Sequence, residues 1–132
     1  MSALAVDTHT IVWYLAADSR LSPKAASLDG ATAEGEFIHV PSVCLVELTY
    51  LVEKGRLPPS ARERLLAALD DPTTPRRLAP LDRSVADAPE SVSRAEVPEL
   101  PDRIVPATAV ALGVPLVSRD GKIRASQVRT IW

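Results

Sequence analysis

The sequence has almost no cysteine, no long apolar run and little net charge. Its single cysteine, Cys44, lies in an apolar segment, and one thiol can form neither an internal disulfide nor a thiolate metal cluster. We therefore expect Cys44 to be a small buried hydrophobe. The first seven residues carry no basic segment, and their apolar run is too short for a signal peptide or a membrane span, so the expected location is cytoplasmic, with no membrane partner.

The small net charge of -2 argues against a strongly basic surface for nucleic acid. The distribution of charge is nevertheless uneven, because basic residues gather near the C-terminal acids, and 12 of the 15 are arginine, which suits bidentate contacts to phosphate. The candidate phosphate-binding residues are Arg103, Arg119, Lys122 and Arg124. A solvated basic face is the alternative.

The length of 132 residues and the hydrophobic share of 46% are those of one ordinary globular domain spanning residues 1–132. Short β-branched runs predict strands over residues 3–6, 37–40, 76–81, 115–118 and 128–132. Helical patterns follow Asp7 and cover residues 23–34, 42–55, 59–69, 82–95 and 102–113. This alternation predicts an α/β fold with a central, mostly parallel sheet of four to five short strands, flanked by helices.

Three aspartates are expected beside the carboxyl ends of the strands, where α/β folds bind ligands. Asp7 ends the first strand, Asp102 opens a late helix and Asp120 follows the fourth predicted strand. Each also has a purely structural interpretation: Asp7 and Asp102 as helix caps, and Asp120, which precedes Gly121, as part of a turn.

Glu47 is the most informative single residue. It is the only charge in the segment 43–52, which is apolar nearly all round, so its carboxylate must lie at or beside the core. An unpaired buried carboxylate is costly, and it needs a cation, a set of hydrogen bonds or a proton. A structural Glu with all its hydrogen bonds made is the alternative.

Four short segments, residues 6–9, 46–48, 101–104 and 118–120, together resemble the PIN-domain ribonucleases, and most closely the VapC-type toxins of bacterial toxin–antitoxin pairs. Their order and spacing match that family over nearly the whole chain. The resemblance implies a single PIN-like domain in which Asp7, Glu47, Asp102 and Asp120 are catalytic and hold Mg²⁺ or Mn²⁺. It also implies that Ser118 supports this site from behind the ligands.

The resemblance further implies hydrolysis of RNA phosphodiester bonds, leaving a 3′ hydroxyl and a 5′ phosphate, with single-stranded or looped RNA as substrate. Four converging carboxylates repel one another, so a cation is needed near neutral pH, and hard oxygen ligands select Mg²⁺ or Mn²⁺. The partner it implies is a small antitoxin that lies in a helical groove and blocks the acids. Apolar residues also suggest a partner or homodimer contact, with core packing as the alternative: Trp13, Tyr14, Val43, Tyr50 and Leu51.

Pro106 departs from the family pattern and predicts a late helix that is tightened or bent at its start.

Two other functions compete with ribonuclease activity. An aspartate-nucleophile phosphatase would need a second acid two residues after Asp7, but His9 stands there, and a lone His near a helix start is typical of a structural or surface group. The second is a catalytically weak binding module that acts through a protein partner.

Overall fold

The computed structural model describes residues 3–22, 36–88, 94–126 and 128–132, and a parallel β-sheet runs through its centre. The strands are β1 (Leu4–Val6), β2 (Ile38–Pro41), β3 (Arg76–Ala79), β4 (Leu116–Val117) and β5 (Thr130–Ile131). They lie in the order β3-β2-β1-β4-β5, and each neighbouring pair is parallel. The predicted α/β fold with a parallel sheet is therefore confirmed.

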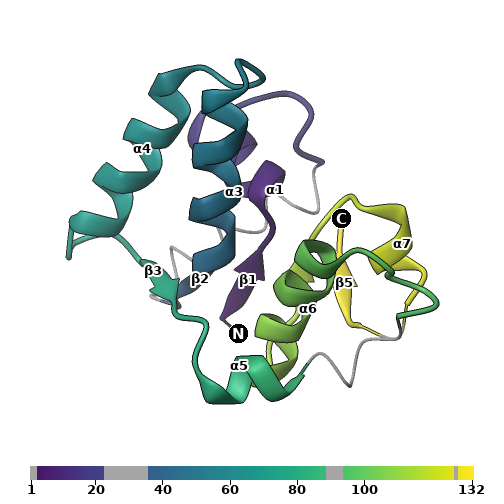
Figure 1. Cartoon of the computed structure of the whole chain (residues 1–132). Helices are drawn as coiled ribbons and strands as arrows, with labels where there is room; N and C mark the ends of the chain where they lie inside the picture. Colours follow the sequence, from purple (N-terminus) through teal and green to yellow (C-terminus); the bar gives the residue numbers. More distant parts are fainter. Residues whose placement is uncertain (1–2, 23–35, 89–93, 127) are drawn as a thin grey trace.

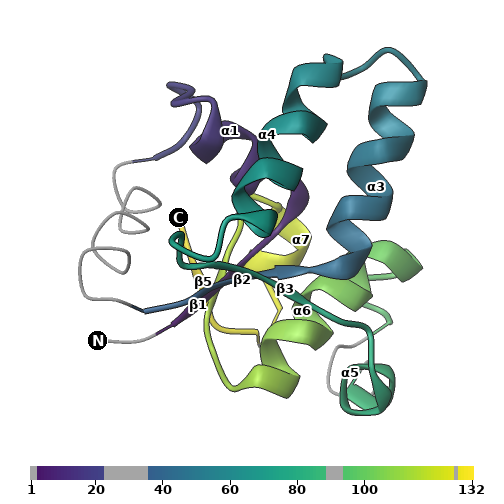
Figure 2. The same cartoon turned by 90° about the vertical axis from the view of Figure 1, so that its left-hand side faces the viewer.

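Helices cover both faces of this sheet. They are α1 (Thr8–Leu15), α3 (Ser42–Glu53), α4 (Pro59–Asp70), α5 (Arg83–Asp87), α6 (Leu100–Leu112) and α7 (Gly121–Arg124). Helices α1 and α4 lie on one side of the sheet, and α5 and α6 lie on the other (Figure 2). Helix α3 contacts both α4 and α6. Within the described ranges, no helix combines the length and apolarity that a membrane span needs.

The core forms where β1 passes through the middle of the sheet. All three residues of β1 are buried, as expected of a parallel strand with helices on both faces. Cys44 and Leu48 on α3 are also fully buried, and burial raises the pKa of the Cys44 thiol. The interpretation of Cys44 as a buried hydrophobe is thus confirmed. The core fixes the end of β1, from which α1 begins (Figure 1).

Two helix predictions need comment. The helix expected over residues 82–95 is wrong in its length: α5 ends at Asp87, and residues 94 and 95 lie in a turn. The sequence supplies the reason, because Pro89 has no backbone N–H with which to continue the helix. The helix expected over residues 23–34 lies outside the described residues.

The helix that carries Asp102 begins two residues earlier than expected. Helix α6 starts at Leu100 with Glu99 as its N-cap, so the capping interpretation of Asp102 is wrong and its side chain lies in the first turn. Proline is accommodated at the start of a helix because the first N–H groups have no helical partner there. The helix also continues through Pro106 as far as Leu112.

The segment around Asp120 is also more regular than the sequence predicted. The turn predicted around Asp120 is instead the start of the short helix α7, which follows β4 by three residues. Asp120 is its N-cap, and its side chain accepts hydrogen bonds from the backbone N–H groups of Lys122 and Ile123. Asp and Gly favour turns and helix starts alike, which is why the sequence alone did not separate the two.

Candidate functional site

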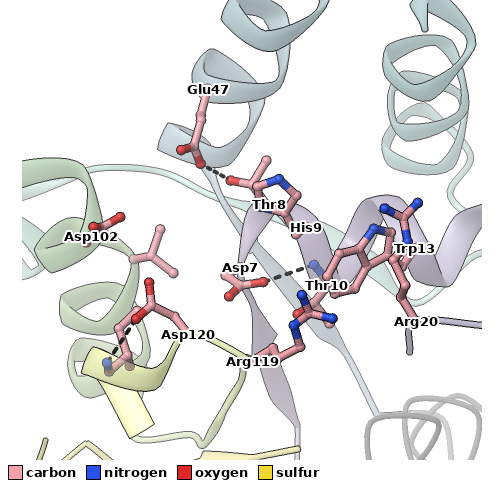
Figure 3. Close-up of a pocket in the computed structure, with 12 residues that line it drawn as sticks. Asp7, Thr8, His9, Thr10, Trp13, Arg20, Glu47, Asp102, Arg119 and Asp120 are labelled. Atoms are coloured by element: carbon pink, nitrogen blue, oxygen red, sulfur yellow. Dashed lines mark hydrogen bonds between the residues drawn. The ribbon is translucent and has the colours of Figure 1, made fainter. Parts of the chain in front are cut away.

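All four predicted acids line one pocket of about 420 Å³ at the carboxyl end of β1. They reach it from four different elements: Asp7 from the end of β1, Glu47 from α3, Asp102 from α6 and Asp120 from the start of α7 (Figure 3). The other lining residues are Thr8, His9, Thr10, Trp13, Arg20, Val105, Arg119 and Ile123.

Asp7 is held by two donors of its own chain. One carboxylate oxygen accepts a hydrogen bond of 3.0 Å from the backbone N–H of Thr10, which makes Asp7 the N-cap of α1. The other accepts a bond of 2.5 Å from the hydroxyl of Ser118, which is fully buried. The backbone N–H of Asp7 also donates to the carbonyl of Val117 in β4. The side chain is therefore fixed at the junction of β1, α1 and β4.

The carboxylate of Glu47 has one hydrogen-bond donor, a hydroxyl group. Its carboxylate accepts a hydrogen bond from the hydroxyl of Thr8, a buried residue at the start of α1. Glu47 itself is half-buried on α3, while Cys44 and Leu48 on the same helix are fully buried. The sequence argument that this carboxylate lies beside the core and needs a polar partner therefore agrees with its position.

Asp120, like Asp7, caps a helix and contacts Ser118, but it contacts Ser118 through its backbone N–H and not through its carboxylate. Its carboxylate accepts from the backbone N–H of Lys122 at 2.9 Å and of Ile123 at 3.2 Å. Its own backbone N–H donates to the Ser118 hydroxyl at 3.1 Å. One buried serine thus connects the two acids that follow β1 and β4. Its supporting role in the site stays a prediction.

Asp102 differs from the other three acids. It is half-buried, and among the described residues no group donates a hydrogen bond to its side chain. Burial raises the pKa of Asp102, and the negative charges of Asp120 and Glu47 raise it further, against a smaller opposing effect of Lys122. The electrostatic coupling places Asp102, Asp120 and Glu47 in one negative field.

The donor set fits a hard divalent cation. The four carboxylates supply oxygen ligands, and the one thiol of the chain, that of Cys44, is buried and is not part of the pocket wall. Over the residues the structure describes, no three acidic, His or Cys side chains already lie close enough to enclose an ion. Mg²⁺ commonly keeps several waters and uses only one or two carboxylates directly, so a spread set of acids suits it.

Of the four predicted phosphate-binding residues, only Arg119 lines this pocket. Arg103 lies in α6 beside Asp102, and Lys122 and Arg124 lie in α7, but the side chains of these three are not part of the pocket wall. Their role stays a prediction that rests on their position near the acids.

Sequence reasoning missed the pocket wall that comes from α1 and the segment after it. His9, which was set aside as a structural or surface group, lines the pocket, as do Trp13 and Arg20. The rings of His9 and Trp13 are 5.7 Å apart. The four-residue spacing of His9 and Trp13 puts them on one face of a helix, which was the available signal. No comparable sequence signal marked Arg20.

Comparison with known families identifies the chain. Residues 4–127 match the model of the PIN domain, so the chain belongs to the PIN domain family. No curated protein sequence matches it. The predicted family and the predicted fold class are both confirmed by this match and by the sheet.

Solved structures with a similar fold include toxin–antitoxin complexes. VapBC2 of Rickettsia felis, solved with a DNA fragment of its promoter, is similar at a TM-score of 0.70 and 16% identity, covering 97% of this chain and 96% of that one. A toxin–antitoxin complex from Klebsiella pneumoniae has a TM-score of 0.63 and 21% identity, with 94% and 92% covered. FitAcB of Neisseria gonorrhoeae has a TM-score of 0.59 and 23% identity, with 96% and 95% covered.

Proposed function

We propose that this PIN-domain chain is a metal-dependent endoribonuclease and the toxin of a type II toxin–antitoxin pair. One observation carries the proposal: the four acids Asp7, Glu47, Asp102 and Asp120 are spread over 113 positions of the chain, from 7 to 120, yet all four line one pocket. Structural carboxylates have no reason to gather in this way, because like charges repel. The site, the membership of the PIN domain family and the fold shared with toxin–antitoxin complexes point to the same activity.

The pocket residues have different roles in the proposed hydrolysis. Asp7 and Asp120 are rigid acceptors, because helix N–H groups and Ser118 hold them. Glu47 and Asp102 face them from α3 and α6 (Figure 3). Mg²⁺ or Mn²⁺ bound by these acids would supply Lewis-acid chemistry and make water a better nucleophile near neutral pH. Arg119 offers a guanidinium for a phosphate oxygen of the substrate.

The bonds exchanged follow from the products that the family resemblance implies. Water adds its oxygen to phosphorus, and the bond between phosphorus and the 3′ oxygen breaks. The 3′ oxygen takes up a proton and leaves as a hydroxyl, while the phosphate remains on the 5′ side. Burial raises the pKa of Asp102, and the charges of Asp120 and Glu47 raise it further, so a cation in the pocket would favour the ionised form of this carboxylate.

The direct test is a cleavage assay on the purified protein. A panel of transfer and ribosomal RNA is incubated with Mg²⁺, Mn²⁺ or chelator, and the cut ends are mapped. We expect cleavage only with metal, 5′ phosphate ends, and loss of cleavage by orders of magnitude in Asp7→Asn, which is nearly the same shape as the parent. Cleavage that persists after exhaustive chelation would contradict the metal mechanism.

The exposed face of α3 offers a binding site for the proposed antitoxin. Val46 and Tyr50 on this helix are 68% and 54% exposed, one turn apart, and they flank Glu47 in sequence. Of the other apolar residues proposed for a partner contact, Trp13 is buried and Tyr14, Val43 and Leu51 are half-buried. An antitoxin segment on this face of α3 would lie beside the pocket acid that the same helix carries.

Co-expression with candidate antitoxins, namely small proteins encoded next to the gene of this chain, tests the partner. We expect a stable complex that no longer cuts RNA, and a weaker complex for the double variant Val46→Ser, Tyr50→Ser. A homodimer through the same face would appear instead as an oligomer of the chain alone, measured by analytical ultracentrifugation.

The second candidate function is a catalytically weak binding module. It is favoured by one observation: within the described residues the acids are spread over the pocket and three of them already have hydrogen-bond donors of the chain. A metal titration separates the two functions. The nuclease is stabilised against heat by Mg²⁺ or Mn²⁺ in a manner that depends on Asp7, whereas the binding module is not.

A further inference from the structure

Two arginines contact one aromatic ring on the wall of the pocket. The guanidinium carbon of Arg119 lies 4.9 Å from the centre of the Trp13 ring, and that of Arg20 lies 5.1 Å from it. Figure 3 draws the ring between the two side chains, on the side of the pocket next to Asp7. All three residues line the pocket. A tryptophan ring attracts cations to its faces, so Trp13 orients both guanidiniums.

The two arginines differ in their free charge. The Arg20 guanidinium binds Asp18 through two hydrogen bonds, of 3.0 and 2.7 Å, and these lower the pKa of Asp18 to about 2. Asp18 is therefore ionised over the whole working range of pH and balances the charge of Arg20. Arg119 is exposed, and among the described residues no carboxylate pairs with it. Its positive charge is available to a ligand.

We propose that Arg119, held in place by the ring of Trp13, clamps a phosphate of the RNA substrate, and that Arg20 forms a latent second cation of this clamp. The inference rests on the proposed function, since the ligand is the RNA substrate. Trp13 is then a positioning residue: it limits the rotamers of two long side chains before the substrate arrives, which lowers the entropy lost on binding. Sequence reasoning had assigned neither Trp13 nor Arg20 to substrate binding.

The ligand group is a phosphate because of what the wall leaves accessible. Trp13 is only 7% exposed, and its ring already contacts both guanidiniums, His9 and, at 5.9 Å between ring centres, Trp132. It therefore offers no free face for a base. The guanidiniums of Arg119 and Arg20 beside this ring are exposed, and they match the oxygens of a phosphate in geometry and charge.

The test measures binding without cleavage. A short single-stranded RNA oligonucleotide labelled with fluorescein is titrated with the full chain in chelator, and anisotropy gives Kd at several salt concentrations. Loss of one charge-assisted contact in Arg119→Gln should raise Kd about tenfold. It should also lower the slope of log affinity against log salt by about 0.7.

Arg129→Gln is the matched control for this variant. Arg129 is also exposed, but its carbonyl accepts from the N–H of Leu116 where β4 begins, at the opposite end of the strand from Arg119. The change in net charge is the same in both variants. Because Arg129 lies at the opposite end of β4, Kd and the salt slope should stay near the parent's values in Arg129→Gln. Equal effects in the two variants would show a general charge effect and overturn the clamp.

A second pair of variants tests the latent cation, with the opposite sign. Asp18→Asn removes the charge that balances Arg20, while an amide oxygen can still accept from the Arg20 backbone N–H that Asp18 binds at 2.8 Å. We expect RNA to bind several-fold more tightly. Asp87→Asn is the control, because it removes the acid of an exposed ion pair with Arg83 at 2.8 Å on α5, outside the pocket. Tightening in both variants, or in neither, contradicts the assignment of Arg20.

The positioning role of Trp13 is read from kinetics. Trp13→Phe keeps an aromatic ring in the core but binds cations less strongly, so it should raise KM for RNA and leave kcat near that of the parent. A fall in kcat alone would show that Trp13 has only a structural role. Trp13→Phe with an unchanged KM would contradict the positioning role.

The outcomes separate the clamp from the nuclease. RNA that is cut with Mn²⁺ but bound equally well by Arg119→Gln and by the parent overturns the clamp and leaves the nuclease in place. RNA that is bound through Arg119 but never cut with Mg²⁺ or Mn²⁺ overturns the nuclease and leaves the clamp. A parent that does not bind the oligonucleotide even at low salt overturns the clamp directly.

Discussion

The two sides of the pocket hold their carboxylates differently. On one side, at the ends of β1 and β4, Asp7 and Asp120 cap helices and share the buried Ser118. On the other side, Asp102 lies in the first turn of α6, and no described residue donates a hydrogen bond to it. Glu47 stands between these cases, with one hydroxyl donor from Thr8.

This difference indicates which acids contribute to the stability of the fold. A capping aspartate satisfies backbone N–H groups, so folding alone could retain Asp7 and Asp120. Asp102 does no comparable work, and burial and the charges of Asp120 and Glu47 act against its ionised form. A half-buried acid that folding does not use is best explained by a ligand, and Asp102 therefore gives the strongest argument for function.

The largest expected effect comes from removing the charge of Asp102. Asp102→Asn should lower RNA cleavage about 100-fold or more, because loss of even an indirect support of a metal ligand lowers metal affinity or activity by about 10- to 100-fold. In chelator its Tm should not fall below that of the parent. Cleavage rates and thermal melts measure the two quantities.

Asp87→Asn is the matched control for Asp102→Asn, because Asp87 is an exposed acid that does not line the pocket. It should cut RNA as fast as the parent. If Asp102→Asn instead lost stability and kept its cleavage, Asp102 would be a structural acid and the comparison between the two sides would fail.

Ser118 is the residue through which the rigid side can be loosened. Ser118→Ala removes the donor to Asp7 and the acceptor for the backbone N–H of Asp120, so both acids lose orientation. We expect the affinity for Mn²⁺ to fall about tenfold, as measured by calorimetry. Ser126→Ala is a suitable comparison, since Ser126 also bonds backbone groups after a helix but does not line the pocket. It should leave metal affinity unchanged.

A smaller effect separates capping from catalysis at Asp7. Asp7→Ala loses the cap of α1, which should cost about 1 kcal/mol and lower Tm by roughly 3 °C in chelator. Asp7→Asn keeps a capping oxygen for the N–H of Thr10 and should melt no lower than the parent. Both variants should lose cleavage. Equal Tm values for Asp7→Ala and Asp7→Asn would show that the cap contributes little.

The sequence predicted the rigid features of this molecule better than the irregular ones. Strands such as β1 and helices such as α3 have strong apolar patterns, and the parallel sheet follows from their alternation. For Asp7 the choice between a cap and a site residue was posed as exclusive, whereas its carboxylate both caps α1 and lines the pocket. Two oxygens with several lone pairs allow both.

What the sequence did not predict depends on contacts between distant or unpatterned segments. Arg20 enters the pocket because Asp18 and the ring of Trp13 hold it, and neither contact leaves a periodic signal. Asp102 was expected to open its helix, with a cap as its structural alternative, but α6 begins at Leu100, since proline near the first helical position does not prevent the helix from starting earlier. Helix boundaries near prolines are decided by such local competition.

The smallest expected effect is a dependence of stability on pH that belongs to Asp102. Its pKa is raised in the folded protein by burial and by Asp120 and Glu47, so the folded state binds its proton more tightly than the unfolded state does. The parent in chelator therefore loses stability as the pH rises from the unfolded pKa of about 4 through the higher folded value, and the loss is constant above that.

The variant Asp102→Asn has no carboxyl proton at this position, so it lacks this dependence on pH. The Tm of Asp102→Asn minus that of the parent should be close to zero below about pH 4 and become positive toward neutral pH. Thermal melts over this range, in chelator, measure the difference, and added Mg²⁺ should reduce it because a cation offsets the repulsion in the parent. A Tm difference that is the same at all pH values, or that is negative at neutral pH, would show that the ionised form of Asp102 is not destabilised in the folded protein. It would also remove the contrast between the two sides of the pocket.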